Sequence, residues 1–262
     1  MLQKDLELAM AAAREAGRRT LDFFGGNFAV SDKGGGDPLT PADLAANALL
    51  REHLRAERPD YGWFSEETVD DGARLAHRQT WIVDPIDGTR EFVEGIPEYV
   101  VCVALVDEGV PTVGVIYNPA RDDLYAAVRG GGTFLNGKRV FCTETADLQT
   151  ATAVVSRSED KRGEIDVYRP HIGSIIPVGS VAYKLALVAS GTQDLNFSVQ
   201  SKNEWDICAG DLLIREAGGQ LFDLEGQVRS YNQRDPLIRN GLVAGNEELS
   251  HQMLRLIAEE KP

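Results

Sequence analysis

The sequence has no long apolar segment, few cysteines and few histidines. Its longest apolar run, about Tyr99 to Val106, is too short to cross a membrane as a helix. The four histidines lie apart from one another and from the acidic motifs, which argues against a histidine-based metal site. The three cysteines are widely spaced, which excludes a disulfide framework and a cysteine-ligated zinc site and is typical of thiols in a reducing cytoplasm: Cys102, Cys142 and Cys208.

Positive charge is also scarce, since 27 Lys and Arg residues face 41 Asp and Glu residues, for a net charge of −14. This balance argues against a nucleic acid polymer or an anionic membrane as the partner. A phosphorylated substrate would therefore be held through metal ions and local N–H groups. The acidic, amphipathic N-terminus has no signal-peptide pattern, so we expect a cytoplasmic protein.

The chain of 262 residues is long enough for one large domain or two modest ones. Apolar and alanine positions at helical spacing predict a helix from residue 2 to about 24, which the pair Gly25-Gly26 ends. Three strands, Tyr99–Asp107, Pro111–Asn118 and Asp123–Arg129, predict an antiparallel meander. Beyond about residue 145 strands and helices alternate, so we predict an α+β domain at 1–145 and an α/β domain at 146–262.

The organising motif of the sequence runs from Trp81 to Phe92 and holds two acids three positions apart. Trp81–Val83 predicts a short buried strand, which Pro85 ends because proline cannot donate to a β-ladder. Asp84 then stands at the end of the strand, and Asp87 lies across a tight turn from it.

The residues after Asp87 predict a turn and the beginning of a helix. Gly88 permits a backbone conformation that other residues resist, and Thr89 is expected to cap a helix that starts near Arg90. Two carboxylates held a few ångströms apart repel by roughly 4 kcal/mol at an effective dielectric constant of about 20, so they need a cation or a shared proton. Turns and helix caps also use Asp-Pro and Asp-Gly pairs, so the motif alone leaves a plain structural role open.

Three other segments carry acids at the ends of strands or the beginnings of helices. The segment from Thr40 to Asp43 predicts a helix start with a capping box. Glu66-Glu67 follow an apolar aromatic run, and Asp206 lies in the first turn of a predicted helix. Each also has a plainer explanation, because Asp43 can be only a cap, Glu66 part of a solvated patch, and Asp206 an acid that the helix dipole favours.

Two lysines have two interpretations each. Lys184 lies inside an apolar helix predicted from Gly179 to Ser190, either as a surface lysine whose stem packs on the helix or as an anion contact. Lys33 lies in a glycine-rich loop, residues 31–37, which fits a linker and an active-site flap equally well. From this loop the lysine could reach an anion.

These segments together resemble a known enzyme superfamily. The matching motifs are Glu66-Glu67 after an apolar strand, Asp84-Pro85-Ile86-Asp87-Gly88-Thr89, Trp205-Asp206 followed by Ala209-Gly210, and Thr40-Pro41-Ala42-Asp43. Their order and spacing resemble the lithium-sensitive, magnesium-dependent phosphomonoesterases, which include inositol monophosphatases and 3′(2′),5′-bisphosphate nucleotidases. The resemblance implies a layered αβαβα sandwich with the site between the two halves of the chain.

The same resemblance implies two Mg²⁺ ions and a third, weaker one. Glu66, Asp84 and the Ile86 carbonyl are similar to the ligands of one ion. Asp84, Asp87 and Asp206 are similar to the ligands of a second, and Glu66 would also contact the third. Two ions roughly 3.5–4 Å apart would lower the pKa of the attacking water and neutralise the leaving alkoxide. No covalent enzyme intermediate is implied.

Roles in phosphate binding and catalysis follow from the resemblance as well. The N–H groups of Gly88 and Thr89 would hold the phosphate, and the Thr89 hydroxyl, oriented by Asp43, would position the water. The residues with implied catalytic roles are therefore Asp43, Glu66 and Thr89.

Around the phosphate, three features are more similar to the nucleotidases than to the inositol monophosphatases. Arg90-Glu91-Phe92 continue the motif much as in the nucleotidases, Ser156-Arg157-Ser158 match their Ser-Arg-Ser segment, and Gly179-Ser180 with Lys184 resemble their Gly-Ser-Ser…Lys element without its second serine. Val199, or the neighbouring Gln200 or Ser201 if the alignment shifts, stands where inositol monophosphatases usually place a carboxylate for sugar hydroxyls. The implied substrate-binding residues are Asp87, Gly88, Thr89, Ser156, Ser158, Ser180 and Lys184.

We therefore predict a phosphatase that removes the 3′-phosphate from 3′-phosphoadenosine 5′-phosphate with metal-activated water. Inositol-1-monophosphatase is the main alternative, and histidinol-phosphatase or sugar bisphosphatase is a more remote one. A non-catalytic ligand-binding protein on the same fold would have lost a metal ligand or Thr89, and none is lost. The sequence leaves the oligomeric state open, with a homodimer as one assembly that it permits.

Overall fold

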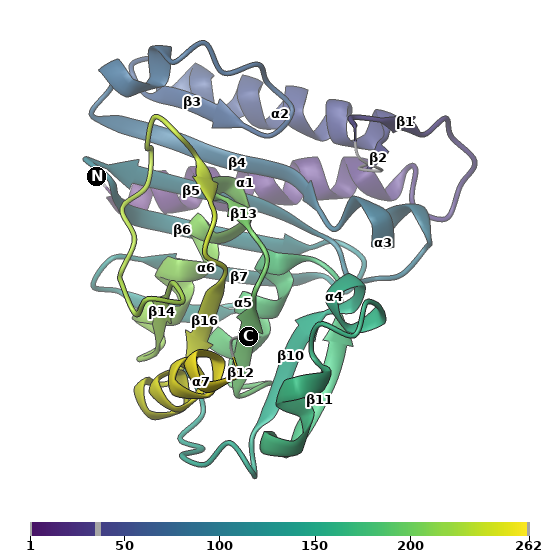
Figure 1. Ribbon diagram of the computed structural model, residues 1–262. Coiled ribbons are helices and arrows are strands. Elements are labelled where there is room, and N and C mark those ends of the chain that lie inside the picture. The colour runs from purple at the N-terminus through teal and green to yellow at the C-terminus, as the bar shows by residue number, and fades with distance from the viewer. Residues whose placement is uncertain (1, 35–37, 261–262) are drawn as a thin grey trace.

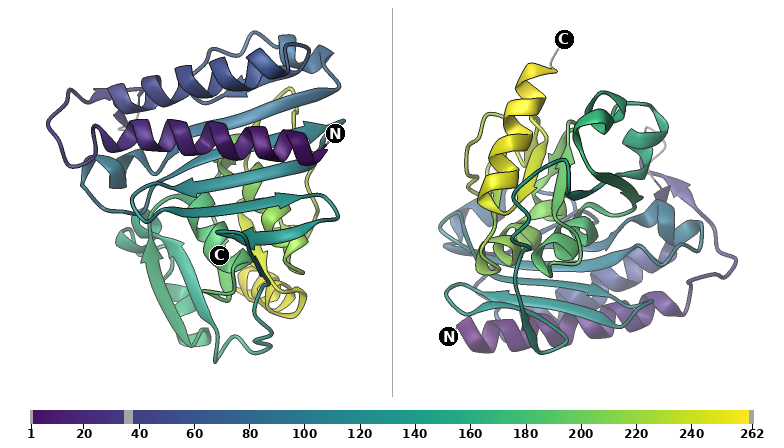
Figure 2. Two further views of the ribbon diagram at one scale, coloured as in Figure 1. Left: turned by 180° about the vertical axis from the view of Figure 1, so that it is seen from behind. Right: turned by 90° about the horizontal axis from the view of Figure 1, so that it is seen from below.

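Helices and two large β-sheets alternate in five layers in the computed structural model, which describes residues 2–34 and 38–260 (Figure 1). One outer layer holds α1 (Leu2–Leu21) and α2 (Pro41–Glu57), which lie side by side across a sheet (Figure 2). The middle layer holds α5 (Val181–Ala189) and α6 (Glu204–Glu216), and α7 (Glu247–Glu259) covers the second sheet. The predicted αβαβα sandwich is confirmed. No helix in the described part of the chain is long and apolar enough to cross a membrane.

The first large sheet has seven strands in chain order. Its first two strands are parallel and the remaining pairs are antiparallel, so the predicted meander is confirmed. The strands are β3 (Gly62–Ser65), β4 (Gln79–Asp87), β5 (Val100–Asp107), β6 (Val110–Asn118), β7 (Asp123–Val128), β8 (Gly132–Leu135) and β9 (Lys138–Val140).

The second large sheet has five strands, and its order differs from chain order. β10 is parallel to both of its neighbours, whereas the pairs made by β16 are antiparallel. From edge to edge the strands are β11 (Ser174–Val178), β10 (Thr152–Ser156), β12 (Leu195–Ser198), β16 (Leu242–Gly245) and β14 (Gln220–Phe222).

Short elements connect these layers. Two small antiparallel pairs join β1 (Ser31–Asp32) to β2 (Pro38–Leu39) and β13 (Lys202–Asn203) to β15 (Leu237–Ile238). The short helices are α3 (Thr89–Val93), α4 (Arg157–Lys161) and the 3₁₀ turns η1 (Ala73–Ala76) and η2 (Asp166–His171).

Small residues allow the outer helix α1 to lie close to the first sheet. Its buried face is a stripe of alanines, and a Cβ at Gly17 would lie only 2.6 Å from the Tyr117 ring of β6. The helix ends at Leu21 rather than near residue 24, and hydrogen-bonded turns continue the chain to Gly26. Close approach of this kind maximises dispersion contacts in the core.

The layer between the two sheets is packed from both halves of the chain. Ile82 and Ile116 from the first sheet share one hydrophobic cluster with Leu185 and Leu213 from α5 and α6. A Cβ at Gly114 would lie 2.8 Å from the carbonyl of a residue in α6, so the absence of a side chain there lets the helix rest on β6. The expected division at residue 145 therefore separates two halves that share a core.

The expectation that Pro85 ends its strand is wrong. β4 continues to Asp87, with an irregularity in its pairing between Asp84 and Asp87. The partner on the other side, β3, ends opposite Val83. Pro85 therefore lies where β4 has a neighbour on one side only, and at a bulge, where its missing N–H breaks no ladder hydrogen bond.

Candidate active site

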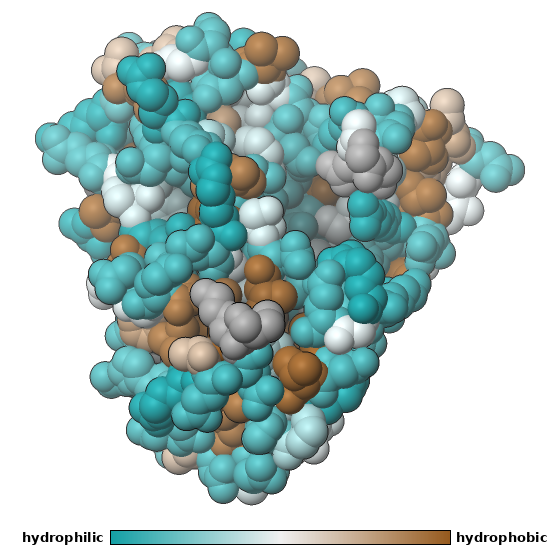
Figure 3. All heavy atoms as spheres, in the orientation of Figure 1, coloured by the Kyte–Doolittle hydropathy of each residue, from teal (hydrophilic) through white to brown (hydrophobic). Residues whose placement is uncertain are grey.

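A cavity of about 370 Å³ opens between the two halves of the chain. Hydrophilic side chains predominate on the face of the molecule shown in Figure 3. Most of the residues singled out by the sequence line this cavity, whereas Asp43 lies behind its wall. The predicted residues on the wall are Glu66, Asp84, Ile86, Asp87, Gly88, Thr89, Ser156, Ser158, Ser180, Lys184 and Asp206.

Four carboxylates from three segments form one wall, which we call the acidic wall: Glu66, Asp84, Asp87 and Asp206. Glu66 follows β3, Asp84 and Asp87 lie in the last part of β4, and Asp206 lies in the first turn of α6. Burial raises the pKa of Asp84 well above its usual value, and the charges of Glu66, Asp87 and Asp206 raise it further. Burial also raises the pKa of Asp206 well above its usual value, and the charges of Asp87 and Glu66 raise it further.

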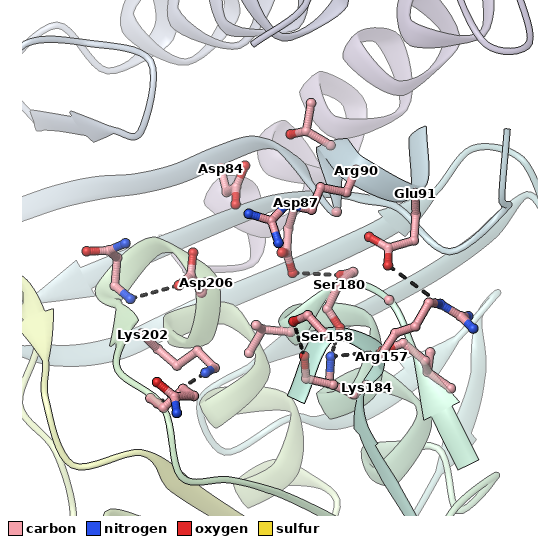
Figure 4. Close-up of a pocket in the computed structure, with 18 of the residues that line it drawn as sticks. Asp84, Asp87, Arg90, Glu91, Arg157, Ser158, Ser180, Lys184, Lys202 and Asp206 are labelled. Carbon is pink, nitrogen blue, oxygen red and sulfur yellow. Dashed lines mark hydrogen bonds and ion pairs between the residues drawn. The ribbon is translucent and has the colours of Figure 1, made fainter. Parts of the chain in front are cut away.

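Protein donors fix the orientation of Asp87. Its Oδ2 accepts a hydrogen bond from the Ser180 hydroxyl at 2.6 Å (Figure 4) and another from the Ala182 N–H at 2.5 Å. Both donors lie at the beginning of α5, so a carboxylate from one half caps a helix of the other. Ser180 holds a positive φ of 54°, which is uncommon outside glycine and indicates local strain at this contact.

The other acids are also held by the protein. Asp206 Oδ2 accepts from the Asn203 N–H at 2.7 Å in a capping box, and Asp84 Oδ1 accepts from the Ile86 N–H at 3.0 Å. Glu66 Oε1 accepts from the Lys33 ammonium at 2.8 Å. These contacts fix one oxygen of each carboxyl group, and the groups still face one cavity.

The donor set fits a hard divalent cation. Among residues 2–34 and 38–260, no three acidic, thiol or imidazole side chains converge on a ready-made ion site. The acidic wall nevertheless offers only oxygen donors. Asp84 and Asp87 are buried, whereas Glu66 and Asp206 are half-buried. Burial and the three neighbouring carboxylates raise the pKa of Asp84, and a bound cation would offset this repulsion. Mg²⁺ prefers oxygen ligands and usually keeps several waters, so it does not require an all-protein cage. When bound, Mg²⁺ would lower the pKa of a water and offset charge on a leaving oxygen.

Lys33 contacts anions, as the sequence allowed, and these anions are carboxylates of the protein itself. Its ammonium contacts Glu66 and also the neighbouring Glu67. Burial lowers the pKa of Lys33, but attraction to these two carboxylates outweighs this effect and raises the pKa above its usual value. Residues 35–37 of the predicted 31–37 loop lie outside the described residues.

Thr89 and Asp43 form a hydrogen-bonded pair beside the acidic wall. The Thr89 hydroxyl is directed at Asp43 Oδ1 at 3.1 Å and at the Ile86 carbonyl at 3.0 Å. Asp43 Oδ2 accepts from the N–H and the hydroxyl of Thr40, so the predicted capping box is confirmed. Burial raises the pKa of Asp43, although these hydrogen bonds act in the opposite direction.

Thr89 does not cap α3, contrary to expectation. The N-cap is Gly88, at a positive φ of 95°, and Thr89 is the first residue of the helix. The glycine conformation turns the chain sharply enough that the Thr89 hydroxyl faces Asp43 rather than the N–H groups of its own helix.

Substitution of Gly88 should destabilise the fold for two reasons. A Cβ there would lie 2.9 Å from the Glu98 carbonyl oxygen and 3.1 Å from Ser180 Cβ. We expect Gly88→Ala to lower the free energy of unfolding by roughly 3 kcal/mol, because it combines a positive φ with overpacking. Gly25 is the matched control, since it has a φ of 72° and nothing within 4 Å of its Cβ position. Gly25→Ala should cost roughly 1 kcal/mol; equal losses in urea unfolding would contradict the packing argument.

The wall opposite the acids carries cations that already have protein partners. Arg157 contacts Glu98 at 2.5 Å and Glu91 at 3.8 Å. Lys202, which the sequence analysis missed, contacts Glu159 at 3.4 Å and donates to the Ser198 hydroxyl at 2.7 Å. The only sign of this role in the sequence was that Lys202 lies just before the Asp206 motif.

Lys184 is not the surface lysine that the sequence allowed as one interpretation, and its predicted contact with a bound anion stays a prediction. Only 2% of it is exposed, and its ammonium donates to the carbonyl groups of Ser180 at 2.5 Å and Val178 at 3.3 Å. It therefore holds the loop before α5 from inside the wall. The apolar spacing of this helix did not indicate this role, because the carbonyl oxygens that accept from the ammonium belong to residues before the helix. Ser156 and Ser158 also bind each other, with 2.9 Å between their hydroxyl oxygens.

Burial of Lys184 predicts a specific pH dependence of stability. Burial lowers the pKa of its ammonium from 10.5 to about 8, although the charge of Asp87 acts in the opposite direction. Between these two pH values the unfolded chain keeps the proton that the folded protein releases, so wild-type stability rises with pH there. In EDTA, the Tm of the wild type relative to Lys184→Met should therefore rise between about pH 7.5 and 10. A difference that is constant over this range would contradict the buried, charged lysine.

A model of the inositol monophosphatase family matches residues 1–261, which is nearly the whole sequence. The chain belongs to the inositol monophosphatase family. Among curated relatives, the inositol-1-monophosphatase of Mesorhizobium japonicum is 37% identical over 262 residues, which cover 96% of this chain and 95% of the relative. The histidinol-phosphatase of Chlorobaculum parvum is 35% identical and covers 97% and 96%. Both relatives are named as phosphatases.

Solved structures of the inositol monophosphatase family share the fold over the whole chain. The Thermotoga maritima IMPase aligns with a TM-score of 0.87 at 28% identity, over 98% of this chain and 97% of that one. CysQ from Bacteroides thetaiotaomicron aligns with a TM-score of 0.77 at 29% identity, over 94% and 98%. The family predicted from the motifs is thus confirmed, whereas its nucleotidase branch is not favoured over the inositol monophosphatases.

Proposed function

We propose that this protein is a Mg²⁺-dependent phosphomonoesterase that acts on the monophosphate of a neutral polyol, with inositol 1-phosphate as the first candidate. The observation that carries the proposal is the acidic wall beside the Thr89–Asp43 pair in one cavity. Glu66, Asp84 and the Ile86 carbonyl would hold one ion, and Asp84, Asp87 and Asp206 a second. The curated relatives named inositol-1-monophosphatase support this choice.

The chain's own groups have distinct tasks in this reaction. Gly88 and Thr89 line the cavity at the beginning of α3, where their N–H groups would bind phosphate oxygens. The Thr89 hydroxyl, held by Asp43, can orient a water toward phosphorus and pass on its proton. Direct attack by water needs no covalent intermediate on the enzyme.

Charge on the opposite wall supports a neutral alcohol over a bisphosphate. The sequence-based preference for 3′-phosphoadenosine 5′-phosphate requires cations that are available for a second phosphate. Arg157 is paired with two carboxylates, Lys202 with Glu159, and Lys184 with two carbonyls. A second phosphate would have to displace these partners, whereas a polyol can exchange hydrogen bonds with hydroxyls and carboxylates on the wall.

The test is Mg²⁺-dependent phosphate release from three substrates at matched concentrations: inositol 1-phosphate, histidinol phosphate and 3′-phosphoadenosine 5′-phosphate. We expect the highest kcat/KM for inositol 1-phosphate and no release in EDTA. A preference for the nucleotide would be compatible with the acidic wall as the metal site. It would contradict our argument that the opposite wall has no cation available for a second phosphate. Absence of release from all three would argue instead for a non-catalytic protein on this fold.

A further inference from the structure

A buried arginine outside the cavity connects elements that carry the acidic wall. Arg74 of η1 is only 2% exposed. Its guanidinium donates to Asn232 Oδ1 at 2.6 Å, to the Gln233 carbonyl at 2.8 Å and to Asp70 at 3.0 Å. It also lies 3.9 Å above the centroid of the Phe64 ring, a cation–π contact inside the protein. None of these five residues lines the cavity.

The loop that contains Asn232 and Gln233 is also held by a buried acid. Glu204, the first residue of α6, is also 2% exposed. Its two carboxylate oxygens accept from the N–H of Asn232 at 2.7 Å and the N–H of Gln233 at 2.9 Å. The loop dipeptide is thus held between Arg74 and Glu204. We call these four residues the clasp: Arg74, Glu204, Asn232 and Gln233.

The clasp joins three elements that supply the acidic wall. Phe64 lies two residues before Glu66, and its ring packs on Trp205 with 5.0 Å between ring centroids. Glu204 and Trp205 directly precede Asp206 in the first turn of α6. The Asn232 side chain also donates to Thr80 at 3.2 Å, on the strand that carries Asp84. The three elements that carry Glu66, Asp84 and Asp206 are therefore connected to one another through the clasp and the Phe64–Trp205 contact.

On the basis of the proposed function, we infer that Arg74 and Glu204 are positioning residues for divalent-cation binding. The clasp sets the distance between Asp206 in one half and Glu66 and Asp84 in the other. Multidentate, charge-assisted hydrogen bonds suit this task, because they fix direction as well as distance. A change in the clasp should weaken the cation site while leaving the Thr89–Asp43 pair intact.

The first readout is direct titration of Mn²⁺ or Mg²⁺ into the full chain by calorimetry, with phosphate release as the second. We expect Glu204→Gln and Arg74→Gln each to weaken cation affinity about 10-fold, as for other groups that orient metal ligands. At saturating Mg²⁺, kcat should stay within about twofold of the wild type, so that added metal rescues the variants. Asn232 has a φ of 59°, so Asn232→Gly removes its side-chain contacts with Arg74 and Thr80 without adding backbone strain, while its N–H can still donate to Glu204. This variant tests the Arg74 side of the clasp if an Arg74 variant fails to fold.

Arg78→Gln is the matched control, because Arg78 forms a surface ion pair with Asp107 and is 70% exposed. Its cation affinity should equal that of the wild type. Wild-type affinity in folded Glu204→Gln and Asn232→Gly, with only a lower Tm, would overturn the inference and leave the proposed function standing. Absence of cation binding by the wild type would overturn the proposed metal site, and the inference with it.

Discussion

Asp84→Asn should lower Mg²⁺-dependent phosphate release by roughly a thousandfold, since charge stabilisation by a metal ion contributes several kcal/mol to such a reaction. Asp84 is the carboxylate assigned to both ions, and it is 1% exposed at the centre of the acidic wall. The measurement is kcat/KM for inositol 1-phosphate over a range of Mg²⁺ concentrations. Turnover equal to that of the wild type would rule out the proposed site.

The same substitution should stabilise the metal-free protein. Burial and three neighbouring carboxylates raise the pKa of Asp84, so its charge is unfavourable in the folded state. An amide of the same shape removes that repulsion, and in EDTA we expect Tm to rise by a few degrees, at about 2–4 °C per kcal/mol for a chain near this size. Asp122→Asn is the control, because Asp122 is 75% exposed and pairs with Arg14 at the surface. A fall in Tm for Asp84→Asn would show that the carboxylate is stabilised rather than strained.

Thr89→Ala should lower kcat about a hundredfold and change KM little, because positioned proton transfer contributes about this factor or more. The hydroxyl contacts Asp43 and the Ile86 carbonyl, whereas the backbone N–H available to phosphate is unchanged in the variant. Steady-state kinetics, together with binding of inorganic phosphate, separates the two roles.

Thr89→Ser is the matched control for this prediction. Serine keeps the hydroxyl that binds Asp43 and loses only a methyl group, so its kcat should lie close to that of the wild type. Equal losses of phosphate affinity and turnover in Thr89→Ala would show that Thr89 only binds phosphate.

The part of the site that could be predicted from the sequence is the part specified by local geometry. Asp84 and Asp87 follow a β-forming run, and the Asp43 capping box is readable from four residues. Local rules failed where pairing with distant segments decides the outcome. The strand passes through Pro85 because β3, nearly twenty residues earlier in the chain, ends opposite Val83.

The opposite wall and the clasp depend still more on long-range contacts. Nothing near Lys184 in the sequence shows that its ammonium will be buried against carbonyls of the preceding turn. Arg74 and Glu204 are ordinary surface-type residues in the sequence, and their shared partner lies at residues 232 and 233. Charge pairing between distant segments, on which our proposal for the substrate rests, was therefore beyond a motif-based argument.

The cap that Asp87 places on α5 has a consequence for motion of the two halves. Its Oδ2 holds the Ser180 hydroxyl and the Ala182 N–H at once, so the cavity cannot widen at this edge unless both hydrogen bonds break. Asp87 would then act as a latch between the two halves, and we expect slow opening of the cavity to be measurable as hydrogen exchange at the Ala182 amide. If departure of the product requires a wider cavity, the lifetime of this latch sets an upper limit on turnover.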